Sequence, residues 1–134
     1  MKFSTLGLVA AAGLMLAGSA SAHHSGAMFD SAKTVVLEGT VKELQWTNPH
    51  MWLEIYVPGE ANKQVEWGFE MIGTNVMHRQ GWNKDTVNPG DKVTVIGHPL
   101  KDGRPGASYV GIKLANGKEL GCAKTDGTRC VRAE

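Results

Sequence analysis

The chain has 134 residues, with 14 Lys and Arg against 13 Asp and Glu and a formal net charge of +1 at pH 7. This length allows one small domain. Because the charge is nearly balanced and no basic run occurs, the chain lacks the polycationic surface with which a nucleic-acid binder displaces counterions from phosphates. We therefore expect no nucleic-acid partner.

The first 22 residues have the pattern of a secretory signal peptide. Lys2 supplies a positive start, the apolar run from Leu6 to Ala17 is too short to span a bilayer, and Ala20-Ser21-Ala22 places small residues before a cleavage site. The stretch Leu16-Ala17-Gly18-Ser19 resembles a lipoprotein box but has Ser where a lipidated Cys is required. We therefore expect an unanchored periplasmic domain that begins at His23.

Three strands are predicted in the first half of this domain, after an N-terminal segment at residues 23–33 without a strong pattern. The first covers residues 34–46 and changes phase near its end, as a β-bulge would cause. After the turn signal Asn48-Pro49, residues 51–57 and 64–71 alternate between apolar and polar side chains. This alternation predicts a hairpin with one buried face.

A short helix is predicted over residues 74–80. Thr74 or Asn75 can cap its N-terminus, and Gly81 stands where a left-handed residue commonly ends a helix. The helix is only about two turns long. It separates the first three strands from the rest of the domain.

Two further strands are predicted over residues 93–99 and 109–114, and residues 121–134 read as a polar tail. Three strands, a helix and two strands is the element order of an OB-fold, a five-stranded Greek-key barrel. The expected fold is therefore an all-β, OB-like barrel over residues 34–120. In that fold the loops between strands one and two and between strands four and five flank the ligand face. His50 lies in the first loop and His98 opens the second, so we expect them to share one rim.

The expected new N-terminus carries the strongest chemical signal. A first-position His offers two metal donors, its α-amine and its imidazole Nδ1, which close a chelate ring. A second imidazole completes a set of three nitrogens, called a histidine brace, which suits Cu(II). We expect copper bound by His23 as the bidentate ligand and His50 as the opposing imidazole, with His24 or His98 as the remaining or supporting group. The alternative is an inert or partner-docking tail.

A second hypothesis, from a different class of function, is a metal-free interaction module. Trp52 and Tyr56 occupy the polar face of the second strand, and Trp46 ends the first. Together they could form a face for a periplasmic partner protein or a small ligand. Trp67 shares its phase with Val65 and Phe69 and is expected in the core. The carboxylates Glu54, Glu66 and Glu70 read as solvated surface groups.

Catalytic motifs are missing from the sequence. Ser25 and Ser108 lie in no GxSxG context, and no glycine-rich phosphate loop occurs. We therefore assign no catalytic residue and expect a binding module, with an oxygen-activating mononuclear copper enzyme as the enzymatic alternative.

Both cysteines, Cys122 and Cys130, lie in the tail. Exported proteins meet an oxidising compartment, so we expect a disulfide between them. Their spacing matches neither a CxxC redox pair nor the usual zinc pairs.

Several short segments of the mature domain together carry a resemblance. They are Ala22-His23-His24-Ser25, Phe29-Asp30, Leu37-Glu38-Gly39, Trp46-Thr47-Asn48-Pro49-His50, Glu70, Gly81-Trp82 and Pro89-Gly90-Asp91. In this combination the chain resembles a family of small exported bacterial proteins of unknown function. The resemblance implies a periplasmic β-barrel without an established activity. The tail with Cys122 and Cys130 departs from the usual ending of that family.

Overall fold

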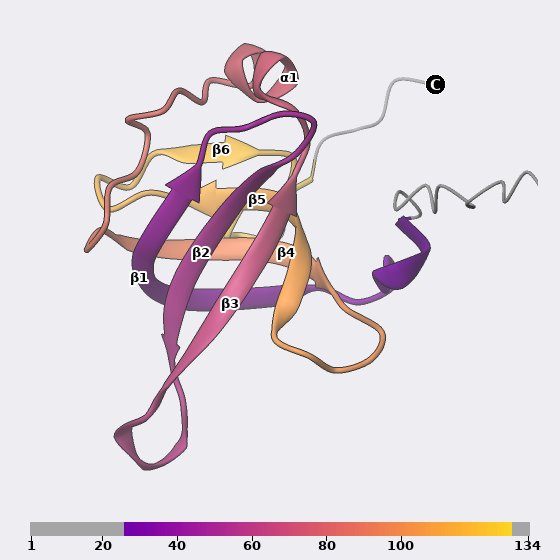
Figure 1. The fold of residues 1–134 in the computed structure, drawn as a ribbon, viewed down its shortest axis with the longest axis vertical. Helices are drawn as coiled ribbons and strands as arrows, with labels where there is room; N and C mark the ends of the chain where they lie inside the picture. The colour runs from indigo at the N-terminus through magenta and orange to yellow at the C-terminus, as the bar shows by residue number, and fades with distance from the viewer. Residues whose placement is uncertain (1–25, 130–134) are drawn as a thin grey trace, which may run out of the picture.

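Six strands form one sheet in a computed structural model that describes residues 26–129 (Figure 1). The strands are β1 (Val35–Gln45), β2 (Met51–Pro58), β3 (Gln64–Met71), β4 (Lys92–Pro99), β5 (Gly106–Lys113) and β6 (Glu119–Gly121). Helical turns in the described range are η1 (Gly26–Met28), η2 (Glu60–Asn62) and α1 (Thr74–Arg79). No helix in the described range is long and apolar enough to cross a bilayer.

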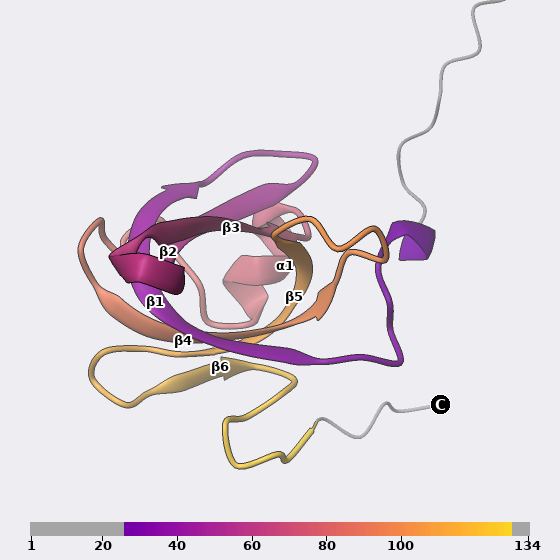
Figure 2. The ribbon, with the colours of Figure 1, turned by 90° about the horizontal axis from the view of Figure 1, so that it is seen from below.

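The first five strands close into a barrel, and Figure 2 shows them arranged as a ring with β6 outside it. The first half of β1 pairs with β4 and its second half with β2, both antiparallel. A parallel pairing of β3 with β5, from Gly68↔Gly106 to Glu70↔Ser108, closes the ring. The all-β, OB-like barrel with one short helix between β3 and β4 is therefore confirmed.

The core lies inside the barrel and follows the alternation of the strands. Met51, Leu53, Ile55 and Phe69 are completely buried. The expected phase change in β1 is a register shift between Val41 and Glu43 in its pairing with β2. The bulge explains why residues on both sides of the shift contribute to the same core.

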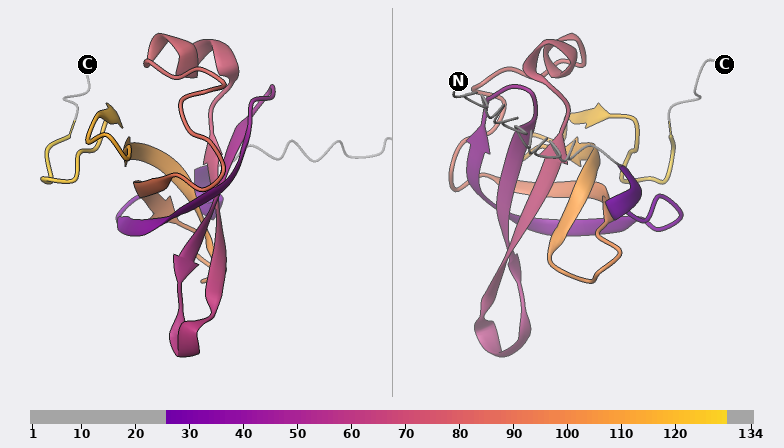
Figure 3. Two further views of the ribbon diagram at one scale, coloured as in Figure 1. Left: turned by 90° about the vertical axis from the view of Figure 1, so that its left-hand side faces the viewer. Right: turned by 45° about the vertical axis from the view of Figure 1, so that its right-hand side comes forward.

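Two expectations about the strands are corrected. Val65 shares the phase of Phe69 but is 38% exposed, because the tip of the β2–β3 hairpin extends past the end of the barrel, as Figures 1 and 3 show. A sixth strand, β6, pairs with β5 through Gly111↔Gly121 to Lys113↔Glu119, where no strand was expected. β6 has three residues, of which Leu120 is buried, so it carries too little alternation to be recognised.

The helix α1 closes one end of the barrel (Figure 1) and buries Met77 against the core. Its N-cap is Gly73, which makes no side-chain cap, and not Thr74 or Asn75 as expected. The missing acceptor comes from the loop between β1 and β2. Asn48 Oδ1 accepts hydrogen bonds from the backbone N–H of Thr74, at 2.9 Å, and from its hydroxyl, at 3.1 Å. The loop that precedes His50 is thereby fixed to the start of the helix.

Candidate functional site

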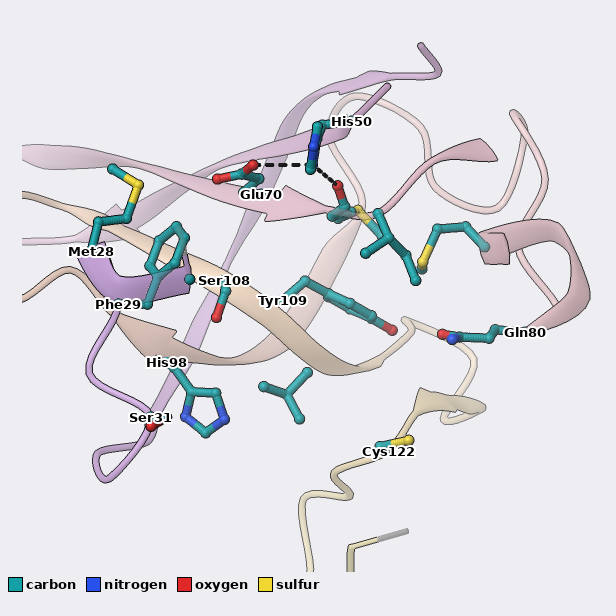
Figure 4. A pocket seen from close by; sticks show the side chains of 15 residues that line it. Met28, Phe29, Ser31, His50, Glu70, Gln80, His98, Ser108, Tyr109 and Cys122 are labelled. Atoms are coloured by element: carbon teal, nitrogen blue, oxygen red, sulfur yellow. Dashed lines mark hydrogen bonds and ion pairs between the residues drawn. The ribbon is translucent and has the colours of Figure 1, made fainter. Parts of the chain in front are cut away.

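A cavity of about 480 Å³ opens beside the β3–β5 closure of the barrel (Figure 4). Its apolar wall includes Phe29, Met71, Met77 and Tyr109, of which both methionines are almost fully buried. Met28 and Ile72 lie at its edge and are about half exposed. A cavity of this size, with an apolar wall and few polar groups, has the character of a small-molecule site.

The polar groups of the cavity come from neighbouring strands. In the sheet register Glu70 of β3 lies beside Ser108 of β5, and Ser108 lies beside His98 of β4. Neighbouring strands are about 4.8 Å apart, so these three residues form one row across the barrel closure. The row depends on the parallel β3–β5 pairing, which no local sequence pattern encodes.

The described N-terminal segment runs along this cavity. Asp30 donates its backbone N–H to the carbonyl of Pro99 at 2.8 Å, and Lys101 donates to the carbonyl of Met28 at 3.0 Å. Phe29 forms an isolated bridge with Leu100. Gly26, the first described residue, lines the cavity. The chain therefore enters the described structure at the cavity itself.

His50 is held by two hydrogen-bond acceptors. Its Nδ1 lies 3.0 Å from Glu70 Oε1 and 3.2 Å from the carbonyl oxygen of Met71. Because a carboxylate and a carbonyl both accept, the neutral form of the ring carries its proton on Nδ1 and its lone pair on Nε2. This is the arrangement in which histidines usually bind metals through Nε2.

His98 has the same tautomer but another position. Its Nδ1 donates to the carbonyl of Lys33 at 2.6 Å, which again leaves the lone pair on Nε2. His50 and His98 both line the cavity, but Figure 4 shows them on opposite sides of it, with Phe29 and Ser108 between. His78 donates its Nδ1 proton to the carbonyl of Trp82 at 3.1 Å and lines a different hollow.

Within residues 26–129, no group of three or more His, Cys, Asp and Glu side chains is placed to hold a metal ion. His23 and His24, the expected N-terminal ligands, lie outside the described residues.

The three residues of the expected interaction face lie in different surroundings. Trp46 lines a hollow beside α1, and Tyr56 lines a groove with Lys92 near the opposite end of β2. Trp52 is 37% exposed on the strand between them. None of the three cavities described for residues 26–129 is lined by all of them.

An ion-pair network occupies the surface near Trp52. Lys42 Nζ lies 2.8 Å from Glu54 and 2.5 Å from Glu66. The hydrogen bonds that Lys42 donates to these two carboxylates raise its pKa above the usual range. Two of the three carboxylates expected to be solvated therefore pair with this lysine.

Sequence reasoning missed Glu70 as a site residue by assigning it to the solvated surface. The side chain of Glu70 is only 19% exposed and contacts His50. The signal that could have found it is the hairpin register. Met51 pairs with Met71, so the residue before Met51 must lie beside the end of β3.

Tyr109 forms a fixed part of the cavity wall. Its hydroxyl accepts a hydrogen bond from Trp82 Nε1 and donates one to the carbonyl of Leu120, both at 3.2 Å. The rings of Tyr109 and Trp82 pack edge to face, with their centroids 5.5 Å apart. Burial raises the pKa of Tyr109, so the phenol stays protonated over the physiological range.

Cys122 also lines the cavity, at the end of β6. Its expected disulfide partner, Cys130, lies outside the described residues. The disulfide therefore stays a prediction.

Comparison with known proteins identifies a family but assigns no activity to it. No curated protein and no solved structure matches the chain. The profile of a group described as a family of unknown function, DUF6152, matches residues 12–108. The match covers most of the barrel and ends before Cys122. The chain thus belongs to the DUF6152 family of unknown function.

Proposed function

We propose that this protein is exported to the periplasm and there binds a transition-metal ion, copper, at the cavity beside His50. The α-amine and Nδ1 of His23 supply two donors after cleavage of the signal peptide, and His50 Nε2 supplies the third. The observation that carries the proposal is the pair of acceptors on His50 Nδ1, Glu70 at 3.0 Å and the Met71 carbonyl at 3.2 Å. They orient the ring and increase the basicity of Nε2.

Chain connectivity makes the donor set accessible. Gly26 lines the cavity, and His23 precedes it by three residues. Three residues span at most about 11 Å, which is enough to cross a cavity of this size and too little to reach the far side of the domain. This reach allows the N-terminal amine to enter the cavity that Gly26 and His50 both line.

The choice of metal follows from the donors. Three nitrogen ligands suit Cu(II), which also stands highest in the affinity order of divalent first-row metals. The negative charge of Glu70 beside His50 further favours a bound cation. His98 takes a supporting place, because its ring lies across the cavity from His50 (Figure 4).

The metal-free alternative has less support. An interaction face built from Trp46, Trp52 and Tyr56 would need these side chains to converge, and they line separate places on the surface. The domain therefore acts as a metal-binding module, to which we assign no catalytic residue.

Copper titration of the processed protein tests this proposal. The protein is produced with its signal peptide, mass spectrometry establishes whether it begins at His23, and Cu(II) binding is followed by electron paramagnetic resonance and calorimetry. One Met added before His23 separates the α-amine from the first imidazole and is expected to weaken binding by at least about tenfold, since it removes one of three donors. Unchanged affinity would overturn the brace.

Single substitutions identify the third donor. We expect His50→Ala to weaken Cu(II) binding more than His98→Ala does. His78→Ala serves as the matched control, because His78 has the same tautomer in a different hollow. Equal affinity of the His50→Ala and His78→Ala variants would exclude His50 as a ligand.

A further inference from the structure

The cavity also has the features of a binding site for an organic cation. We infer that the metal-free domain binds small primary ammonium compounds with an aromatic or branched aliphatic body, and that Glu70 recognises the ammonium group. This inference goes beyond metal binding and does not depend on it. Charge, hydrogen-bonding capacity and wall composition support it.

Charge selects the sign of the ligand. Of the described residues that line the cavity, Glu70 is the only carboxylate, and no Lys or Arg is present. The side chain of Glu70 is 19% exposed, so its charge is less screened by water than a surface carboxylate. This charge would repel an anionic ligand, and no Lys or Arg of the described lining offsets the repulsion. An ammonium group would instead be attracted to Glu70 and neutralise its charge.

The hydrogen-bonding groups also favour a donor ligand. An ionised carboxylate accepts only, through about four lone-pair sites, and His50 uses one oxygen of Glu70. In its neutral form His98 presents Nε2 as an acceptor, since its Nδ1–H donates to the backbone carbonyl of Lys33. An ammonium group has three donors and no acceptor, which matches this set.

The remaining wall fits an apolar body. Phe29, Tyr109 and the thioethers of Met71 and Met77 form a wall without formal charge. The volume of about 480 Å³ is within the range of small-molecule sites. Tyr109 is held by hydrogen bonds on both sides of its hydroxyl, so this part of the wall is already in place before a ligand binds.

The test compares three probes with one body and different charge: benzylamine, benzyl alcohol and benzoate. Each is titrated at about pH 8, above the ordinary pKa of histidine side chains, into the full mature protein after removal of metal with a chelator. Amide shifts in two-dimensional NMR report the affinity and the location. We expect benzylamine to bind at least tenfold more tightly than benzoate, with benzyl alcohol between them and the shifts centred on Tyr109 and Val110.

Two substitutions test the role of charge. Glu70→Gln is expected to abolish the preference for benzylamine over benzyl alcohol, while Glu43→Gln, the same change on an exposed residue of β1, leaves it intact. Ile72→Lys places a positive charge at the exposed edge of the cavity and should reverse the preference toward benzoate. Thermal unfolding of each variant checks that the fold is retained.

The outcomes separate this inference from metal binding. Benzoate binding as tightly as benzylamine, the absence of binding by all three probes, or a preference that survives Glu70→Gln would each overturn the ammonium site. None of these results bears on copper binding by His23, which is measured with the metal alone. Loss of copper binding with a retained benzylamine site would overturn the proposed function and leave this inference standing.

Discussion

Glu70 Oε1 lies 3.0 Å from Nδ1 of His50, and both residues lie at the open end of the β2–β3 hairpin, one before β2 begins and the other near the end of β3. Met51 pairs with Met71, so the hairpin register places the last loop residue before β2 beside the end of β3. The carboxylate therefore fixes both the tautomer and the orientation of a ring at the edge of the cavity. The candidate metal site depends on this contact.

The first prediction concerns the contribution of Glu70 to metal affinity. Removing a carboxylate that orients a metal-binding histidine typically lowers affinity by about 10- to 100-fold. We expect Glu70→Ala to lower Cu(II) affinity within this range. Glu70→Gln should lower it less, because the amide oxygen can still accept a hydrogen bond from His50 Nδ1. Competition titrations of Cu(II) against a chelator of known affinity measure both values.

Glu43→Gln on β1 is the control for the loss of one negative charge, since Glu43 is exposed and does not line the cavity. Equal Cu(II) affinities for the Glu43→Gln, Glu70→Ala and wild-type proteins would contradict a role for the Glu70–His50 contact.

The second prediction concerns the cap of α1. Asn48 Oδ1 accepts from the backbone N–H and the hydroxyl of Thr74, so Asn48→Ala removes the only side-chain acceptor seen at this helix start in the described structure. We expect the free energy of unfolding to fall by about 1 kcal/mol, the usual effect of losing a cap. Urea denaturation measures the change.

Asn75→Ala separates this arrangement from a cap within the helix. Asn75 is exposed on α1, and Ala has the higher helix propensity, so this variant should be neutral or slightly more stable. If Asn75→Ala destabilises the protein and Asn48→Ala does not, the cap is assigned to the wrong residue.

The barrel could be predicted from the sequence because its strands alternate and its turns are marked. The β2–β3 hairpin has apolar residues at every second position, and Gly81 takes the expected left-handed conformation with φ of +92°. The bulge in β1 was visible as a change of phase. These signals are local, and each can be read within a window of about ten residues.

The site could be predicted only in part, because long-range pairing builds it. The sequence placed His50 and His98 in the loops that flank the ligand face, and both line one cavity. It did not show that they lie on opposite sides of that cavity or that Glu70 contacts His50. Those facts follow from the parallel β3–β5 pairing and the hairpin register, which join residues far apart in the chain. The cap from Asn48 was missed for the same reason.

The third prediction concerns close backbone packing next to His98. A Cβ added at Gly97 would lie 2.6 Å from the carbonyl oxygen of Ser108 and 2.9 Å from Ala107 Cβ. Both atoms belong to β5, one to its backbone and one to a Cβ fixed directly on it, so neither can move freely. Gly97→Ala should therefore destabilise the protein by about 1–3 kcal/mol through overpacking. Differential scanning calorimetry of the variant measures the loss.

Gly68→Ala is the matched control within a strand. There the added Cβ would have ordinary contacts at 3.8 Å with the ring of Trp52, and the residue has no positive φ. We expect a change within about 0.5 kcal/mol, and in the stabilising direction if the reduced freedom of the unfolded chain dominates. A larger loss at Gly68 than at Gly97 would refute the packing argument.

The fourth prediction concerns stability at high pH. Burial raises the pKa of Tyr109 above the ordinary value of 10.0. The unfolded chain therefore releases the phenolic proton at a lower pH than the folded chain does. Above about pH 10, each rise in pH stabilises the unfolded state relative to the folded state and lowers the free energy of unfolding. The contribution of Tyr109 is fully present below pH 10 and is lost progressively as pH rises through the folded pKa.

Two phenylalanine variants separate this contribution from general alkaline unfolding. Tyr109→Phe leaves the Trp82 N–H without its acceptor, so the free energy of unfolding should fall by about 1–3 kcal/mol near neutral pH. Above pH 10 the stability of this variant should fall less steeply with pH than that of the wild type. Tyr56→Phe, at the partly exposed tyrosine of β2, controls for the loss of a tyrosine hydroxyl outside the core. Guanidinium unfolding at a series of pH values gives the slopes directly. Identical slopes for Tyr109→Phe and the wild type would mean that Tyr109 ionises with the same pKa in the folded and unfolded chains.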